Sequence, residues 1–264
     1  MLNQKIKAVV VPMIFGLLIV TSQSAMSEVI EDYYANDGPY STTSESVTGF
    51  RIFYPENMVG GHPIITWGNG TASPTAIYQA FLEHLASWGF VVIASNNVAT
   101  QSGSDLIDGI DYLIEQNSYA SSPFYAMLDV EHIGTTGHSQ GGGGAINAAT
   151  DPRVTCSAPI APSPGSITEV DGPVFLVAGQ WDFAVSAALV RSTSYARATG
   201  PTVFGIADRM THTSFIGDAG NARGYLTAWF MYHLQGDDYA AQAFIGECEI
   251  CNNSSWSVDT KNFP

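Results

Sequence analysis

Basic residues are scarce in this chain of 264 residues. It holds 9 Lys and Arg against 24 Asp and Glu, a formal charge of −15 at pH 7. Two of the basic residues, Lys5 and Lys7, lie near the start, so the rest of the chain carries 7 basic against 24 acidic residues. A surface this acidic repels nucleic acid and anionic membranes. We therefore expect neither as a partner.

Cysteine is scarce as well, with only Cys156, Cys248 and Cys251. In an exported protein the close pair Cys248 and Cys251 can form a small disulfide that clamps the C-terminal tail, which leaves Cys156 as a buried thiol on a strand. The pair lies near the chain end rather than at the start of a helix after a strand, which argues against a redox motif. No second Cys/His pair stands at zinc-ligand spacing. The sequence therefore implies no metal and no organic cofactor.

Long apolar runs are absent after residue 20. The one such run, residues 8–20, follows Lys5 and Lys7 and precedes a small-x-small cleavage pattern at residues 25–27. Its length of about 13 residues falls short of the ~20 that span a bilayer. Residues 1–27 are therefore predicted to be a secretory signal peptide, and residues 28–264 a single exported domain without a membrane anchor.

Strand and helix patterns alternate along the chain. The expected strands are residues 50–54, 63–67, 90–95, 130–136, 154–160, 174–178 and 203–207. The expected helices are residues 75–88, 104–116 (with Ser104 as N-cap), 142–149, 187–198 and 222–234. Residues 33–48 are polar and are interpreted as an extended lead-in. The alternation predicts an α/β fold with a doubly wound, mostly parallel sheet and helices on both faces.

Residues 137–141, Gly-His-Ser-Gln-Gly, match the pattern G-x-S-x-G between an expected strand and an expected helix. A strand, a sharp turn and a helix are the context of the α/β-hydrolase nucleophile elbow, which lifts a serine hydroxyl clear of the sheet. The alternative is a Gly-rich turn that only happens to hold a serine, and the flanking elements argue against it. Ser139 is therefore the candidate nucleophile.

A serine nucleophile needs a general base and an acid that orients this base. In this fold they follow in the order Ser, Asp or Glu, then His, so the base is His212 or His233. His212 lies in a loop just after the last expected strand, where the base belongs. His233 lies inside an expected helix and is interpreted as a packed or half-exposed helix residue.

Asp182 is the candidate acid because it follows the carboxyl end of the expected strand 174–178. Functional groups of open α/β sheets gather at that edge. Asp171 precedes the strand and lies at the wrong end, while Asp208 and Asp218 flank His212 too closely. A solvated loop aspartate is the alternative reading of Asp182.

Two backbone N–H donors are needed for the oxyanion of an acyl-transfer intermediate. One is expected at Gln140, directly after the nucleophile. The other is expected from the loop after strand 63–67, at Gly70, with Asn69 and Thr71 as alternatives. Asn69-Gly70-Thr71 also fits a glycosylation pattern, which a buried catalytic loop would make accidental.

Several segments together resemble the bacterial cutinase group, which includes polyester and poly(ethylene terephthalate) hydrolases and is related to chlorophyllase-like and lipase-like esterases. They are residues 38–40 (GPY), 52–55 (IFYP), 85–92 (LASWGFVV), 137–143 (GHSQGGG), 158–162 (APIAP) and the Asp182 and His212 loops. They occur in the family's order across nearly all of the chain after residue 27. The resemblance implies a serine esterase that acts through an acyl-enzyme on aliphatic or aromatic polyesters or on short to medium acyl esters.

The chain departs from this family around the acyl cleft. The family usually has Met at Gln140, an aromatic oxyanion residue at Gly70, and Trp where this chain has Ser163 and Pro164. Two aromatic walls are therefore missing or supplied from elsewhere. The candidate replacements, each of which could instead be a core residue, are Trp67, Trp181 and Phe183.

Only about ten residues separate the strand that ends near Pro162 from the one that begins at Pro173, too few for a helical cap domain. An open cleft suits bulky or polymeric esters. The sequence thus predicts a secreted, monomeric, cutinase- or polyesterase-like serine ester hydrolase with an ester or polyester as its partner. A lipase- or chlorophyllase-like esterase, or an acyltransferase with the same triad, stays open. A non-catalytic binding protein would normally have lost a triad member.

Overall fold

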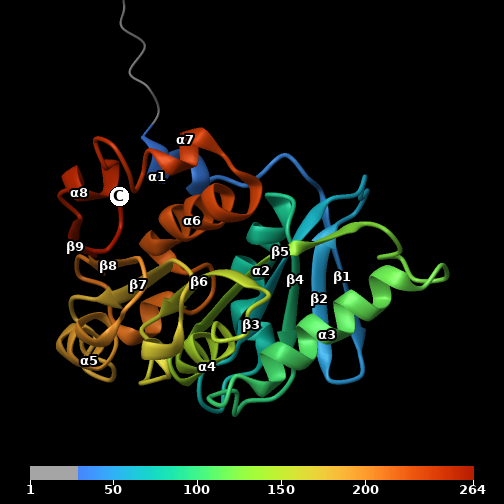
Figure 1. Ribbon diagram of the computed structural model, residues 1–264, viewed down its shortest axis with the longest axis horizontal. Coiled ribbons are helices and arrows are strands. Elements are labelled where there is room, and N and C mark those ends of the chain that lie inside the picture. The colour runs from blue at the N-terminus through green and yellow to red at the C-terminus, as the bar shows by residue number, and fades with distance from the viewer. Residues whose placement is uncertain (1–28) are drawn as a thin grey trace, which may run out of the picture.

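The computed structural model describes residues 29–264, so the expected signal peptide lies outside the described residues. A nine-stranded sheet in the order β1-β2-β4-β3-β5-β6-β7-β8-β9 runs through the molecule (Figure 1). The strands are β1 (Thr42–Val47), β2 (Phe50–Pro55), β3 (His62–Gly68), β4 (Val91–Ser95), β5 (Leu128–His138), β6 (Val154–Ile160), β7 (Val174–Gly179), β8 (Thr202–Ala207) and β9 (Trp256–Lys261). Neighbours from β4 through β8 are parallel, and β1, β2 and β9 join antiparallel. The predicted doubly wound, mostly parallel sheet is confirmed.

Helices cover both faces of this sheet. The α-helices are α1 (Ile30–Ala35), α2 (Gln79–Ser87), α3 (Ser104–Ser118), α4 (Gln140–Ala148), α5 (Ala187–Thr193), α6 (Arg223–Gln235), α7 (Asp238–Ala241) and α8 (Glu249–Asn252). Five short 3-10 helices are η1 (Thr75–Tyr78), η2 (Ile167–Glu169), η3 (Tyr195–Arg197), η4 (His212–Phe215) and η5 (Gly220–Ala222). The connection between β6 and β7 holds only η2, so it contains no helical cap.

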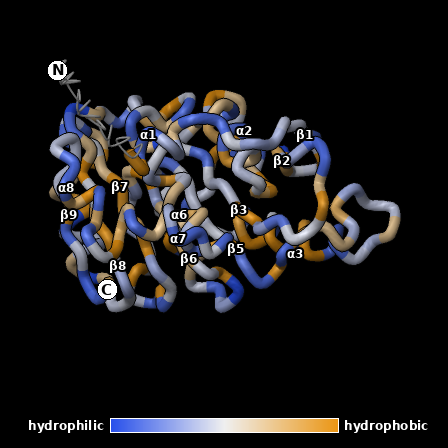
Figure 2. Tube along the Cα trace, turned by 90° about the horizontal axis from the view of Figure 1, so that it is seen from above, coloured by the Kyte–Doolittle hydropathy of each residue, from blue (hydrophilic) through white to orange (hydrophobic). Residues whose placement is uncertain are grey.

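Alternation along each central strand divides the core into two layers. Ile65 and Val92 pack in the cluster that holds α2 and α6. Their neighbours Ile64, Val91 and Ile93 pack in the cluster that holds α3. Because successive side chains point to opposite faces, these uninterrupted apolar runs are buried on both sides. Interior strands with such runs are therefore the elements that hydrophobicity alone predicts well, as for β7 (VFLVAG), whose tube is orange in Figure 2.

The polar edges of the sheet differ from the prediction. The expected lead-in, residues 33–48, instead contains the end of α1 and all of β1, which pairs antiparallel with β2. Strand β9 pairs with β8 and was also unexpected. Both are edge strands with little burial, so no apolar run marks them. The predicted N-cap is wrong too, because Gly103, with φ 82°, holds that position before α3.

The C-terminal segment of the chain is hydrogen-bonded to helix α1. Cys248 and Cys251 form the expected disulfide, and Cys156 is a buried free thiol. Glu31 of α1 accepts hydrogen bonds from Trp256 Nε1 (2.9 Å) and Asn253 Nδ2 (2.6 Å). Burial is the main cause that raises the pKa of Glu31. The N-terminal helix is thus fixed by contacts with residues more than 200 positions away.

Candidate active site

Ser139 lies at a tight turn between β5 and α4. Its backbone has φ 60° and ψ −121°, a strained conformation for a residue with a side chain. Its N–H donates to Ile160 O at 2.9 Å, and its carbonyl accepts from Gly143 N at 3.1 Å. A Cβ on Gly141 would overlap the Gly68 carbonyl, so the end of β3 and the start of α4 approach as only glycines permit. The expected nucleophile elbow is therefore present.

The structure brings Ser139, His212 and Asp182 into one hydrogen-bonded chain. His212 Nδ1 lies 2.7 Å from Asp182 Oδ2, and His212 Nε2 lies 3.0 Å from Ser139 Oγ. A carboxylate only accepts, so Nδ1 carries the proton and Nε2 is free to accept from the serine hydroxyl. The His212 side chain is 22% exposed, whereas that of Asp182 is fully buried. This arrangement has the geometry of an activated serine nucleophile.

The loops that carry the acid and the base are tied together. Asp182 Oδ1 accepts from the N–H groups of Ala184 and Val185, both at 2.8 Å, which fixes the carboxylate. Met210 O, two residues before His212, accepts from Trp181 N at 2.9 Å. These bonds hold Asp182 and His212 at a constant separation. The alternative acids Asp208 and Asp218 instead pair with the arginines of their own surroundings.

Gln140 and the turn after β3 are the two segments expected to supply the oxyanion donors. Gln140 begins α4, and the first N–H groups of a helix have no partner within it. The turn of residues 70–73 is closed by Ser73 N donating to Gly70 O at 3.1 Å. Asn69 is fully buried with its amide bonded to Ser95 O and Asn97 O, so it is not accessible for glycosylation.

Tyr78 and His138 were not singled out from the sequence, yet they lie beneath the site. Tyr78 Oη and His138 Nδ1 share a hydrogen bond of 3.0 Å, and both residues are buried. Burial raises the pKa of Tyr78, while hydrogen bonds from Ser73 and the Gly70 backbone oppose this shift. A Cβ on Gly70 would come 2.7 Å from Tyr78 Oη, so Tyr78 lies directly against the turn that carries the candidate oxyanion donors. Asn69 and Thr71 stay alternatives to Gly70 as the second donor. The signal available in the sequence was the position of Tyr78 eight residues after Gly70, in the same connection between β3 and α2.

The three aromatic residues proposed as cleft walls lie in different surroundings. Trp67 is completely buried on β3, where its Nε1 donates to Asn69 Oδ1 at 3.0 Å and its ring packs on Tyr78. The prediction that Trp67 lines the cleft is therefore wrong, because Trp67 is a core residue. Trp181 and Phe183, on either side of Asp182, are 49% and 93% exposed. They are available for contact from solvent.

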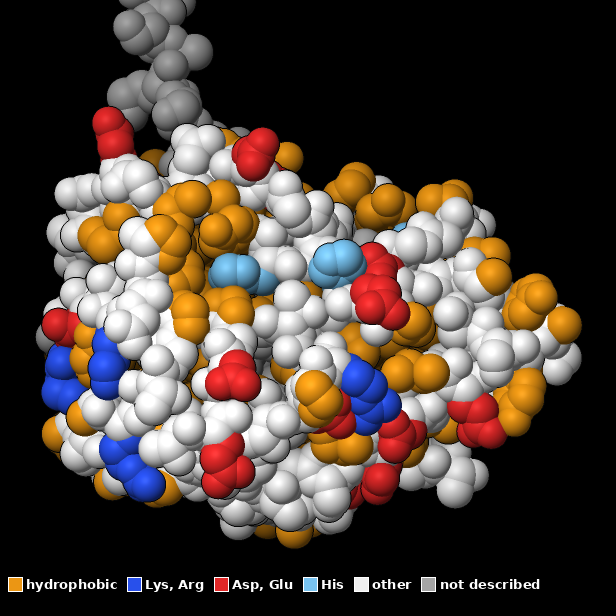
Figure 3. Space-filling model, viewed as in Figure 1, with side chains coloured by type: hydrophobic (Ala, Val, Ile, Leu, Met, Phe, Trp, Pro, Cys, Tyr) orange, Lys and Arg blue, Asp and Glu red, His pale blue; other side chains and the backbone are white. Residues whose placement is uncertain are grey.

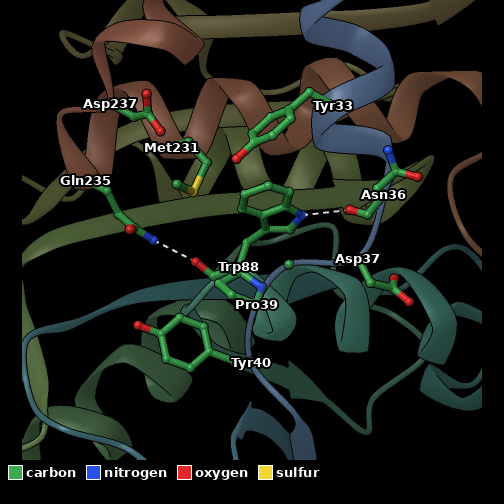
Figure 4. A pocket seen from close by; sticks show the side chains of 10 residues that line it. Tyr33, Asn36, Asp37, Pro39, Tyr40, Trp88, Met231, Gln235 and Asp237 are labelled. Atoms are coloured by element: carbon green, nitrogen blue, oxygen red, sulfur yellow. Dashed lines mark hydrogen bonds between the residues drawn. The ribbon is translucent and has the colours of Figure 1, made fainter. Parts of the chain in front are cut away.

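Other candidates lie away from the hydrogen-bonded chain. His233, the alternative base, packs on Trp229 in α6, and burial lowers its pKa to about 4. A cavity of about 570 Å³ around Trp88 is lined from α1 and α6 and contains none of the candidate site residues (Figure 4). Within residues 29–264, no group of three or more His, Cys, Asp or Glu could hold a metal ion, and no helix could cross a membrane.

Comparison with known proteins gives a consistent family. A family model described as PETase, PET hydrolase-like, matches residues 27–259. Cutinase est2 of Thermobifida alba is 30% identical over 186 residues, which cover 64% of this chain and 60% of that protein. Lipase 1 of Moraxella sp. is 28% identical over 192 residues, 63% of this chain and 56% of that protein. Bis(hydroxyethyl) terephthalate hydrolase of Streptomyces coelicolor is 32% identical over 166 residues, 55% and 51%.

The aligned part of the chain thus spans only about half to three fifths of the length of these relatives. The family model, however, covers nearly the whole chain, and the fold and the site geometry agree with it. On these grounds the chain belongs to the PET hydrolase-like family of ester hydrolases, which has the α/β-hydrolase fold.

Proposed function

We propose that this protein is a secreted serine ester hydrolase that acts on polymeric or bulky esters at an open site, as a cutinase or polyesterase does. The observation that carries the proposal is the unbroken chain from Asp182 through His212 to Ser139 Oγ. The leader pattern in residues 1–27 supports export. The names of the relatives, a cutinase, a bis(hydroxyethyl) terephthalate hydrolase and a lipase, agree with an ester substrate.

Each residue of the triad has a defined role in the mechanism. Ser139 Oγ attacks the ester carbonyl while His212 Nε2 takes its proton, and Asp182 stabilises the resulting imidazolium. Backbone N–H groups of Gln140 and of the Gly70 turn hold the oxyanion. His212 then gives its proton to the leaving alcohol, and water activated by the same His212 hydrolyses the acyl-enzyme. No metal or organic cofactor takes part in these steps.

The surroundings of Ser139 favour a substrate that approaches from a broad surface. The positions that carry aromatic walls in the resembled family hold Gly70 and Ser163 here. The exposed aromatic groups beside Asp182 are instead Phe183 and Trp181, which project into solvent. Exposed rings of this kind contribute apolar contact area for a polymer chain or a film. Acidic residues outnumber basic ones in the whole chain, 24 to 9, and side chains of both kinds lie scattered over the face drawn in Figure 3.

Activity on soluble and solid esters, measured with one set of variants, tests the proposal. Wild type, Ser139→Ala and the control Ser192→Ala, an exposed serine on α5, are assayed with p-nitrophenyl esters of short and long acyl chains and with an aliphatic polyester film. Loss of the nucleophile is expected to lower kcat by roughly 10⁶-fold without unfolding the protein. Ser192→Ala should match the wild type.

The outcomes separate the possible functions. Ser139-dependent release from both esters and film supports a polyesterase. Release from soluble esters alone would indicate an ordinary open-site esterase, and acyl transfer to an added alcohol in preference to water would indicate an acyltransferase. No Ser139-dependent turnover of any ester would refute the hydrolase proposal.

A further inference from the structure

The side chain of Gln140 connects the start of α4 to the loop that follows β4. Its Nε2 donates to the carbonyl of Val98 at 2.5 Å. The same carbonyl accepts the backbone N–H of Ala72 at 3.2 Å. Ala72 belongs to the turn of residues 70–73, which carries the candidate oxyanion donors. One carbonyl therefore connects the residue after the nucleophile with the turn after β3.

The segment that carries this carbonyl is itself fixed. Asn69 Nδ2 donates to Asn97 O at 3.0 Å, and Asn97 Oδ1 accepts from Ala99 N at 3.0 Å. Thr100 Oγ1 donates to Asn69 O at 3.0 Å. Because the loop is bonded on both sides of Val98, its carbonyl is a fixed point. A side chain bonded to it is held in place relative to β3.

We propose that Gln140 is a positioning residue for the oxyanion hole. Its side-chain amide, bonded to Val98 O, sets the distance between its own backbone N–H and the donors of the turn 70–73. The inference rests on the proposed function, since it concerns a tetrahedral oxyanion. It concerns how the hole is held in shape, and not which groups form it.

The bond from Gln140 to Val98 relates two of the chain's departures from the resembled family, Gly70 and Gln140. Gly70 has no side chain that could pack and hold the turn, and Ala72 within the turn has a positive φ of 54°. Hydrogen bonds must therefore maintain the turn's position. The family's usual Met at position 140 cannot donate a hydrogen bond, whereas Gln140 does. The amide of Gln140 thus compensates for the missing aromatic side chain at Gly70.

An interaction that positions the oxyanion hole acts on the transition state. Its loss should lower kcat and leave KM unchanged, because the ground-state ester carbonyl does not need the donors. Removing an oxyanion donor outright costs roughly 10²–10³ in kcat. Displacing a donor without removing it should lower kcat by a smaller factor. We expect a decrease of about tenfold, or ~1.4 kcal/mol.

The matched pair Gln140→Met and Gln235→Met tests the inference. Gln235 makes the same kind of bond, from Nε2 to the carbonyl of Trp88 at 2.9 Å, but in the cavity around Trp88, which contains none of the candidate site residues (Figure 4). Each variant is assayed for kcat and KM on a soluble p-nitrophenyl ester and for its thermal midpoint. The inhibition constant of a trifluoromethyl ketone, which forms a tetrahedral adduct on serine, reports on the oxyanion hole directly.

The expected result is a tenfold lower kcat for Gln140→Met, an equal loss of affinity for the ketone, an unchanged KM, and a Gln235→Met variant like the wild type. Unchanged kcat would overturn the inference, and so would a raised KM alone, which indicates a substrate contact. A thermal midpoint that falls to the assay temperature would make Gln140 merely structural and also overturn it. Absence of Ser139-dependent turnover in the wild type would refute the hydrolase proposal itself, and this inference with it.

Discussion

Acid should destabilise this protein through His138, the residue directly before the nucleophile. His138 is 2% exposed, and its ring centroid lies 4.5 Å from that of His212. Burial is the main cause, and the charge of His212 a further one, that lowers the pKa of His138 to about 3. In the unfolded chain the same imidazole titrates near ~6.5. The folded protein and the unfolded chain therefore bind different numbers of protons over several pH units.

This difference in proton binding fixes the direction in which stability changes with pH. Below pH ~6.5 the unfolded chain takes up a proton at His138 that the folded protein refuses until about pH 3, so stability falls as the pH falls through this window. The slope is ~1.4 kcal/mol per pH unit for one proton. Between pH 6.5 and 4 the loss is on the order of 3 kcal/mol, a large part of a typical total of about 5–15 kcal/mol.

The assay compares how steeply the unfolding free energy of each variant changes with pH, rather than the unfolding free energies themselves. Urea unfolding is followed at pH 7, 6, 5 and 4 for wild type, His138→Asn and the control His132→Asn, whose side chain is 47% exposed. Losing the ring of His138 lowers stability at every pH, but the dependence on pH should become shallower by ~1.4 kcal/mol per unit. His132→Asn should retain the wild-type slope. Parallel curves for wild type and His138→Asn would refute the reasoning, because groups other than His138, such as His84 and His233, would then account for the acid response.

Two further substitutions test the site and the disulfide. Asp182→Asn removes the acceptor for His212 Nδ1–H, so kcat should fall by roughly 10⁴. Asp208→Asn on the neighbouring loop should leave kcat unchanged, and equal losses in both would contradict the choice of acid. Replacing Cys248 and Cys251 together by Ser opens a closed loop of only a few residues. Unfolding free energy should fall by at most ~2 kcal/mol with kcat preserved, and a loss of activity at low temperature would show that the bridge supports the site.

The triad and the central sheet could be predicted because each rests on a local pattern. Strands buried on both faces appear as apolar runs, and the order Ser139, Asp182, His212 follows from the topology of the fold. The exposed edges carry no such pattern. Strand β1 is TTSESV, and it exists because its backbone pairs with β2. Helix α1 has six residues and depends on contacts with α6 and with Trp256.

The burial of aromatic residues near the site could not be predicted from the sequence either. Trp67 and Phe183 are alike in the sequence, since each lies next to a candidate site residue or loop. Trp67 stands inside β3, on the face where α2 packs, and is fully buried. Phe183 follows the end of β7 in a loop whose backbone is held by Asp182, and it is left in solvent. Only the tertiary packing decides which ring a substrate can reach.

Side-chain amides also join the loops at the other altered position of the cleft. Where the resembled family usually has Trp, Ser163 donates its hydroxyl to Gln101 Oε1, and Gln101 Nε2 donates to Pro164 O at 2.9 Å. The loop that holds Val98 is thus bonded to Gln140 on one side and to residues 163–164 on the other. An aromatic substitution at Ser163 would remove its bond to Gln101, and a Cβ at Gly70 would come 2.7 Å from Tyr78 Oη. Restoring the family's aromatic walls therefore requires paired changes, Gln101 with Ser163 and Tyr78 with Gly70, since residues in contact act as units.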